Sequence, residues 1–220
     1  MTTTQLIAVA GSSPGVGKST LCTALAGHLA ATGAVVDHFE EADILTRPAF
    51  RPVADEFAGG SGSVRPATLI DATRAYVDRA RADGTDTLVT DALLPFVPSL
   101  VAWGHREPEI AAFLAELAGA IAPARVSVLY LRDDPDAALR RAVEREGQEW
   151  ADWYVGKLGG SPGTRAVDSL QAAARHLREE TELTLRLLAA TPWDVQVVDV
   201  AGRDADEVAA TAGARLGLDG

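Results

Sequence analysis

A glycine-rich segment near the N-terminus constrains the fold of this 220-residue chain more than any other feature. It reads Gly-Ser-Ser-Pro-Gly-Val-Gly-Lys-Ser-Thr over residues 11–20. Leu6–Ala10, directly before it, is a short apolar run typical of a buried strand, and Lys18–Ala31 has the pattern of a helix. A strand, a glycine-rich turn and a helix in this order predict an α/β fold built around a parallel sheet.

This turn is suited to bind a phosphate group. Its glycines allow successive backbone N–H groups to converge on an anion, and the helix N-terminus adds the positive end of its dipole. We expect Lys18 to reach the β- and γ-phosphates of ATP and the Ser19 hydroxyl to ligate Mg²⁺. Turns of this kind usually have glycine at position 12, where this chain has Ser12; the alternative is a turn without a ligand. The residues expected to contact the nucleotide are Ser13, Pro14, Gly15, Val16, Gly17, Lys18, Ser19 and Thr20.

Four more β-rich runs alternate with helical patterns along the rest of the chain. The predicted strands are Ala34–Phe39, Thr87–Asp91, Val126–Leu131 and Val195–Val200. The predicted helices cover 68–81, 107–121, 135–147 and 166–190, and a last helix ends near 217. Residues 46–66 read as a loop rich in proline and glycine, and 148–165 as an irregular segment rich in aromatic residues and glycine.

These elements predict one domain over residues 1–220. We expect a three-layer P-loop NTPase fold whose five-stranded parallel sheet has the order 2-3-1-4-5. The two irregular stretches would close the site, one as an insertion on the acceptor side at about 43–66 and the other as a lid at about 145–165.

Composition excludes several classes of function. The chain has 31 acidic and 20 basic residues, a formal charge of −11, which argues against nucleic-acid binding. It has no apolar run near the roughly 18 residues of a membrane-spanning helix, and residues 1–5 lack the basic start of a secretory signal. Its single cysteine, Cys22, excludes an internal disulfide and reads as a small buried residue. We therefore expect a cytoplasmic protein with no membrane partner, and homodimer formation is left open.

Two further segments, together with the glycine-rich turn, resemble the nucleoside and nucleotide kinase group of P-loop kinases. Residues 128–135 (VLYLRDDP) and the arginine-rich run after them are similar to the strand, turn and helix that lead into the lid of deoxynucleoside and thymidylate kinases. Residues 197–204 (VVDVAGRD) resemble the adenine-side loop of those kinases, which implies that Gly202 contacts the nucleotide. The resemblance implies an ATP-dependent phosphotransferase that moves the γ-phosphate to a small hydroxylated metabolite or nucleoside.

The same resemblance assigns roles to carboxylates at two strand ends. Glu41 or Glu40, which follow the second predicted strand, would accept the proton of the acceptor hydroxyl. Asp91, which closes the third strand, would hold Mg²⁺ through water or contact the acceptor. The chain departs from the family after Asp91, where residues 92–95 (ALLP) replace the usual acidic residue and arginine. The alternative is that these acids lie in solvated turns.

Arginines supply the expected contacts to phosphate and acceptor. Arg141 and Arg145 share one helix face and would compensate charge on the transferred phosphate. Arg47 and Arg51 would clamp a phosphate or carboxylate of the acceptor. The alternative for both pairs is an ion pair with neighbouring acids: Glu144, Glu146 or Glu149 for the first, and Asp43, Asp55 or Glu56 for the second.

Two other functions remain open at this point. The chain reads as a nucleoside monophosphate kinase if Arg47 and Arg51 face the acceptor. A nucleotide-switch ATPase acting on a protein partner is an alternative of another class, although position 13 is serine and not the second lysine of partition-type ATPases. The rate of ATP turnover distinguishes a kinase from a switch ATPase. A kinase is nearly idle without its acceptor, whereas a switch ATPase responds to its protein partner.

Overall fold

The computed structural model describes residues 3–44, 46–92 and 94–218. Its five strands are β1 (Gln5–Ala10), β2 (Val36–Phe39), β3 (Thr87–Thr90), β4 (Arg125–Arg132) and β5 (Asp194–Asp199). They form one sheet in the order β2-β3-β1-β4-β5, and every neighbouring pair is parallel. The predicted sheet and its order are therefore confirmed, with the strand that precedes the glycine-rich segment at the centre.

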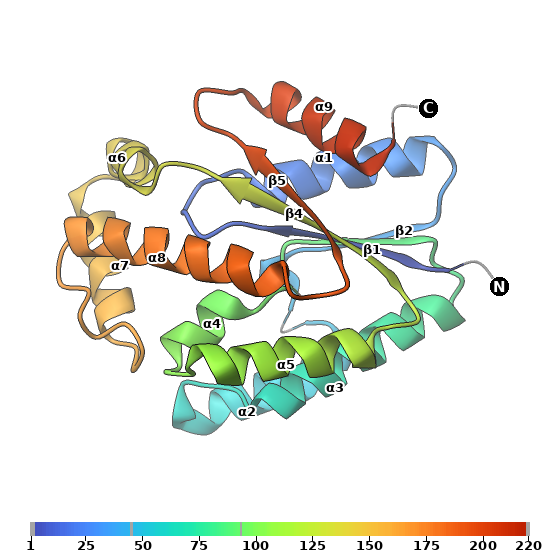
Figure 1. Ribbon diagram of the computed structural model, residues 1–220, viewed down its shortest axis with the longest axis horizontal. Helices are drawn as coiled ribbons and strands as arrows, with labels where there is room; N and C mark the ends of the chain where they lie inside the picture. The colour runs from blue at the N-terminus through green and yellow to red at the C-terminus, as the bar shows by residue number, and fades with distance from the viewer. Residues whose placement is uncertain (1–2, 45, 93, 219–220) are drawn as a thin grey trace.

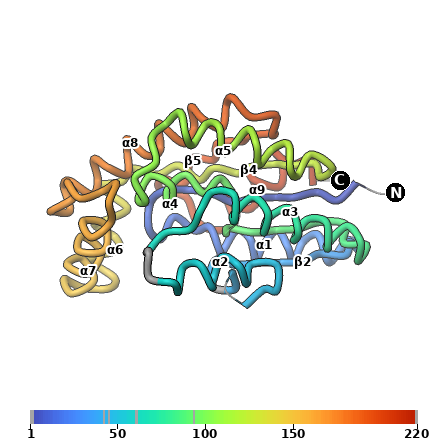
Figure 2. Tube along the Cα trace, turned by 90° about the horizontal axis from the view of Figure 1, so that it is seen from below, coloured from blue at the N-terminus to red at the C-terminus, as the bar shows by residue number. Residues whose placement is uncertain are grey.

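Helices cover both faces of this sheet and give a three-layer α/β fold (Figures 1 and 2). One face carries α1 (Lys18–Ala31) and α9 (Ala205–Leu216). The other face carries α3 (Pro66–Ala82), α5 (Glu107–Ala120) and α8 (Leu170–Leu188). No helix in the parts of the chain that the structure describes is long and apolar enough to cross a lipid bilayer.

The central strand is apolar throughout because both of its faces are covered. The side chains of Leu6 and Ala8 join the hydrophobic cluster beneath α3 and α5, whereas those of Ile7 and Val9 join the cluster beneath α1 and α9. All four side chains are fully buried. A strand buried on both faces loses the alternation of polar and apolar residues, which is why the sequence shows a continuous apolar run.

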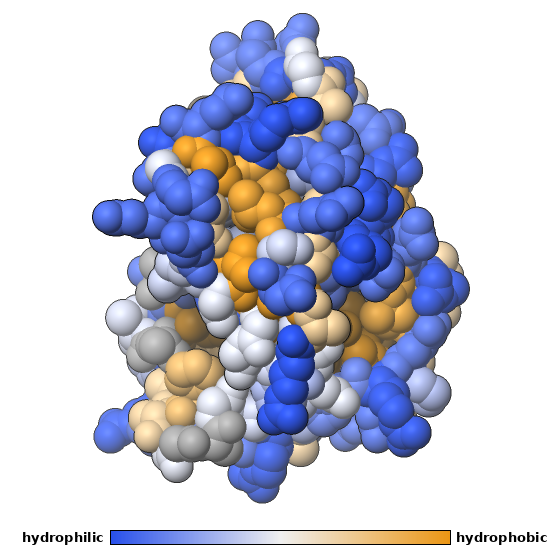
Figure 3. All heavy atoms as spheres, turned by 90° about the vertical axis from the view of Figure 1, so that its left-hand side faces the viewer, coloured by the Kyte–Doolittle hydropathy of each residue, from blue (hydrophilic) through white to orange (hydrophobic). Residues whose placement is uncertain are grey.

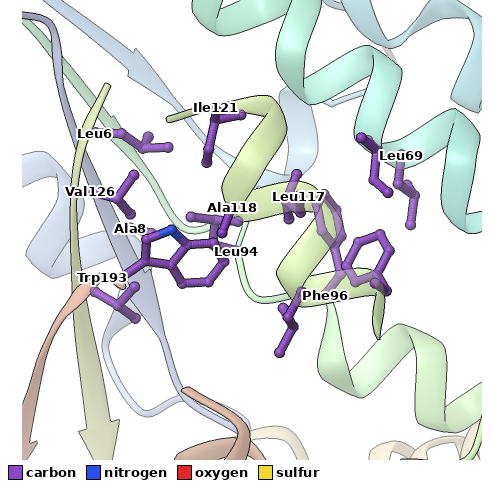
Figure 4. Close-up of a cluster of buried hydrophobic side chains, with 14 of the residues drawn as sticks. Leu6, Ala8, Leu69, Leu94, Phe96, Leu117, Ala118, Ile121, Val126 and Trp193 are labelled. Carbon is purple, nitrogen blue, oxygen red and sulfur yellow. The ribbon is translucent and has the colours of Figure 1, made fainter. Parts of the chain in front are cut away.

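The larger cluster fills the space between the sheet and α5 (Figure 4). Ala8 and Val126 project from the sheet toward Leu117 of α5 and Ile121, the residue that follows the helix. Trp193, directly before β5, lies in the same cluster and is 9% exposed. The indole therefore buries apolar surface beside the beginning of β5, although most of β5 itself is only partly buried.

The prediction of a loop over residues 46–66 is wrong. This stretch contains short helical elements, η2 (Pro48–Phe50), α2 (Arg51–Glu56) and η3 (Phe57–Ser61), after η1 (Glu41–Asp43). Phe50 is fully buried, and its ring stacks on that of Phe39 with the centroids 5.4 Å apart. Burial of this ring against β2 and α3 stabilises turns that are too short to show a helical period.

The segment over residues 148–165 is also more regular than predicted. Helix α6 (Pro135–Glu146) is followed by α7 (Gln148–Gly159), and α8 begins at residue 170, where the Ser169 hydroxyl caps its first turn. The sequence did not predict α4 (Val97–Ala102). The backbone N–H of Gly163 donates to the carbonyl of Ala102 over 2.9 Å, so the chain after α7 is fixed to the end of α4.

Candidate functional site

The carboxyl ends of all five strands lie at one edge of the sheet because the strands are parallel. The glycine-rich loop follows β1 at this edge, Glu40 follows β2, Asp91 follows β3 and Asp133 follows β4. Figure 3 views the molecule from the side toward which the strand arrows of Figure 1 point. Polar residues cover most of this face around a smaller hydrophobic area. Ligands of open parallel sheets bind at such an edge.

The loop between β1 and α1 contains two glycines whose backbone conformation favours glycine. Gly15 and Gly17 adopt left-handed conformations, with φ of 68° and 95°, which residues with a side chain rarely adopt. Gly17 caps α1, so Lys18 and Ser19 occupy the first helical turn, where backbone N–H groups have no partner within the helix. The Val16 side chain is buried and anchors the loop to the core. Backbone N–H groups at a helix N-terminus can bind an anion, so an anion contact at this loop remains a prediction.

The structure shows what glycine at position 11 and serine at position 12 each contact. A Cβ added to Gly11 would lie 2.8 Å from the Leu131 carbonyl oxygen, so close packing on β4 requires glycine at position 11. Ser12 has no left-handed backbone conformation, and its hydroxyl lies 2.8 Å from the Tyr130 hydroxyl. The first corner of the loop is thus fixed by a side-chain hydrogen bond.

Asp91 connects the loop to the segment after β2. Its Oδ2 accepts a hydrogen bond of 2.7 Å from the Ser19 hydroxyl, and its Oδ1 accepts one of 2.9 Å from the backbone N–H of Glu41. The two residues predicted as metal ligands, Ser19 and Asp91, are therefore in direct contact. Both provide oxygen atoms, which are the donors that Mg²⁺ prefers.

Charged groups from three elements surround the buried thiol of Cys22, one turn after the loop. Burial raises the pKa of this thiol above its usual range, the carboxylates of Asp91 and Glu40 raise it further, and the Lys18 ammonium lowers it. Cys22 is fully buried, as predicted. Glu40 Oε1 also lies 3.5 Å from His38 Nε2, whereas the Glu41 side chain is exposed. Lys18, Glu40 and Asp91 thus lie at one end of the sheet, where the sequence analysis expected them.

Arg145 reaches the loop from α6. A Cβ added to Gly15 would lie 3.4 Å from Nη1 and 3.5 Å from Nη2 of Arg145. Its Nε donates to Glu146 over 2.7 Å, which is one of the ion pairs predicted as an alternative. The two terminal nitrogens thus face the loop while the neighbouring glutamate orients the guanidinium.

Arg141 has a different partner from those predicted. Its guanidinium donates to Asp133, whose side chain is only 1% exposed and which also accepts from the backbone N–H of Asp134 over 2.8 Å. Arg141 therefore neutralises a buried carboxylate at the end of β4. A contact between Arg141 and phosphate remains a prediction.

Arg47 and Arg51 lie in different environments. Arg47 forms an ion pair of 3.0 Å with Asp37 and donates to the carbonyl of His38 over 2.9 Å. Its guanidinium also covers the Phe39 ring. Arg51 is 84% exposed and lies 3.9 Å from Asp55, the partner that the alternative interpretation gave it. Arg47 already bonds within the chain, so an acceptor clamp remains a prediction.

The remaining predicted nucleotide residues lie around the same edge. The Ser13 side chain is buried, Pro14 is half-buried and Thr20 is exposed. Gly202 lies in the turn between β5 and α9 with a φ of 71°. Arg203 beside it donates to the Asp199 carbonyl and the Thr211 hydroxyl, which fixes this turn. A base contact at Gly202 remains a prediction.

Comparisons with known proteins show a similarity of fold. No protein-family model matches the sequence, and no curated protein matches it. The crystal structure of APE1195 is similar. It matches with a TM-score of 0.51 and 13% sequence identity, over 100% of this chain and 98% of that one. An identity this low shows a shared fold and leaves the activity to be argued from the site.

Sequence reasoning missed three residues that shape this site. Tyr130 and Thr181 form a hydrogen-bonded chain with Ser12, and Asp133 holds Arg141. The serine at position 12 was the signal in the sequence, because a polar side chain in place of the usual glycine indicates a hydrogen-bond partner nearby. Its partner is 118 positions away, a pairing that no local pattern reveals.

Proposed function

We propose that the protein is an ATP-dependent phosphotransferase that moves the γ-phosphate to a small hydroxylated metabolite or nucleoside. The observation that carries this proposal is the contact of 2.7 Å between Ser19, in the first turn of α1, and Asp91, at the end of the neighbouring strand. This contact brings together two oxygens of the kind that Mg²⁺ prefers, beside a glycine-rich turn at a helix N-terminus, and this supports the proposal. Phosphoryl transfer requires these two parts in this relation.

Different residues of the chain would bind the phosphates, stabilise the transition state and accept the proton. The N–H groups of the loop and the half-buried Lys18 would hold the β- and γ-phosphates. Within the described residues Lys18 forms no ion pair, so its charge is available to an anion. Arg145, above Gly15, would stabilise the charge that develops as the bond to the leaving oxygen breaks. The acceptor oxygen forms the new bond to phosphorus, and its proton passes to a carboxylate.

Magnesium should be required for activity, with Ser19 as a ligand and Asp91 bound directly or through water. When bound, the ion neutralises charge on the phosphate oxygens. We expect Ser19→Ala to raise the Mg²⁺ concentration needed for half-maximal activity by about tenfold, because one donor is lost. Thr32→Ala, at the other end of α1, is the control. Activity that persists in saturating chelator would contradict the metal assignment.

The proposed proton acceptor is Glu41 or Glu40, at the start of η1. The backbone N–H of Glu41 donates to Asp91 Oδ1, which supports a proton acceptor in this turn. We expect Gln at the true base to lower kcat about ten- to a hundredfold with little change in ATP affinity, since a loose transition state needs only modest activation of the nucleophile. If both Glu40→Gln and Glu41→Gln keep the wild-type kcat, Asp91 becomes the candidate base.

ADP release from ATP, measured across a panel of nucleosides, nucleotides and hydroxylated metabolites, tests the proposal. A kinase should be nearly idle in their absence and accelerate with its acceptor. Stimulation by a protein partner with no small acceptor would favour the switch ATPase. The nucleoside monophosphate kinase rested on Arg47 and Arg51 as an acceptor clamp, and no contact among the described residues favours it: Arg47 is bonded to Asp37 and His38, and Arg51 lies 3.9 Å from Asp55.

A further inference from the structure

A chain of hydroxyl groups connects the beginning of the glycine-rich loop to α8. The hydroxyls of Ser12 and Tyr130 are 2.8 Å apart, and Tyr130 donates to the Thr181 hydroxyl over 3.1 Å. A phenol has one proton, so Ser12 must be the donor to Tyr130. Burial is the main cause that raises the pKa of Tyr130, and the phenol therefore keeps its proton. The direction of the chain is Ser12 to Tyr130 to Thr181.

Tyr130 is well placed to control the loop. It is paired in register with Ala10, the last residue of β1, and only 1% of its surface is exposed. The loop is bounded at its other end by Gly17 and the first turn of α1. The stretch between Ser12 and Gly17 is thus held at both ends, which reduces the conformational freedom that an anion would have to restrict on binding.

Helix α8 supports both this chain and α6. Thr181 lies on α8, and Arg178, three residues earlier, donates to Asp136 of α6 over 2.6 Å. Helix α6 carries Arg145, which faces the loop. One helix therefore positions the loop and the helix that brings a guanidinium to it.

We propose that Tyr130 is a positioning residue for the phosphate-binding loop. Its hydroxyl fixes Ser12, and with it the first corner of the loop, in the place where a glycine would otherwise form that corner. Thr181 orients the Tyr130 hydroxyl. The inference rests on the proposed function for its consequence in ATP binding, but the order of the loop itself does not depend on it.

The test compares ATP binding, in the presence of Mg²⁺, among single and double variants of the full chain. Tyr130→Phe and Ser12→Ala should each raise the Kd for ATP about three- to tenfold, as expected for one lost hydrogen bond. The double variant should bind about as the weaker single variant does, because both changes break the same bond. Thr184→Val is the matched control: its buried hydroxyl on α8 has no hydrogen-bond partner among the described residues, and the Kd should be unchanged.

Hydrogen exchange of the loop amides over residues 11–17, measured without nucleotide, separates this inference from the proposed function. The amides should exchange faster in Tyr130→Phe and Ser12→Ala than in the wild type or in Thr184→Val. If the wild type binds no ATP, the proposed function fails and the exchange rates alone decide the role of Tyr130. Wild-type exchange and affinity in both variants, or effects that multiply in the double variant, would overturn the positioning role.

Discussion

Replacing Lys18 with alanine should lower kcat for phosphoryl transfer by at least about 10³-fold while the protein stays folded. The lysine lies in the first turn of α1, half-buried and without an ion pair in the described part of the chain, so its removal leaves no partner unsatisfied. A charged donor aimed at developing negative charge in a site shielded from water contributes much more to the transition state than to the fold. Steady-state kinetics with the best acceptor, beside thermal unfolding, measure the two effects.

The chain offers a matched control because it has only one other lysine. Lys157 lies on α7, where its Nζ is 5.2 Å from the centre of the exposed Trp153 ring. Lys157→Ala should cost at most about 1 kcal/mol of stability and leave kcat near the wild-type value. Near wild-type turnover in Lys18→Ala would refute the proposed phosphotransferase.

The fold followed from the sequence where the signal was local. The central strand, β1, contains an apolar run buried on both faces, and Lys18–Ala31 agrees with α1 residue for residue. Residues 46–66 could not be predicted in the same way. Their helices are three to six residues long, and what holds them is the contact of Phe50 with Phe39 and Tyr76 from distant parts of the chain.

In the candidate site, too, the features that depend on local sequence were predicted and those that depend on distant contacts were not. The loop was readable because its glycines and Lys18 are consecutive, and Asp91 because a strand end in a parallel sheet has a defined place. The partners of Arg47 and Arg141 could not be predicted, whereas Asp55 near Arg51 and Glu146 beside Arg145 were among the expected alternatives. Arg47 pairs with Asp37 and Arg141 with Asp133, and each pairing depends on how the chain turns back after a strand. Only the folded structure shows that these two guanidinium groups already form ion pairs within the chain.

Replacement of Arg145 distinguishes an effect on catalysis from an effect on stability more clearly than replacement of the other arginines. Arg145→Ala should lower kcat about 10²- to 10³-fold and change the KM for the acceptor much less, because the guanidinium approaches the loop at Gly15 and would act on charge in the transition state. Loss of the pair with Glu146 should have little effect on stability, since both side chains are largely exposed.

Two neighbours on α6 provide the comparison that decides this role. Arg140→Ala removes an exposed arginine and should change neither kcat nor the melting temperature. Arg141→Ala should lower stability by about 1–3 kcal/mol, because the 1% exposed carboxylate of Asp133 loses its guanidinium partner. Kinetics and thermal unfolding of the three variants therefore give three different patterns. A wild-type kcat in Arg145→Ala would mean that the approach of its guanidinium to the loop has no part in transfer, and charge compensation would then rest on Lys18 and the loop amides.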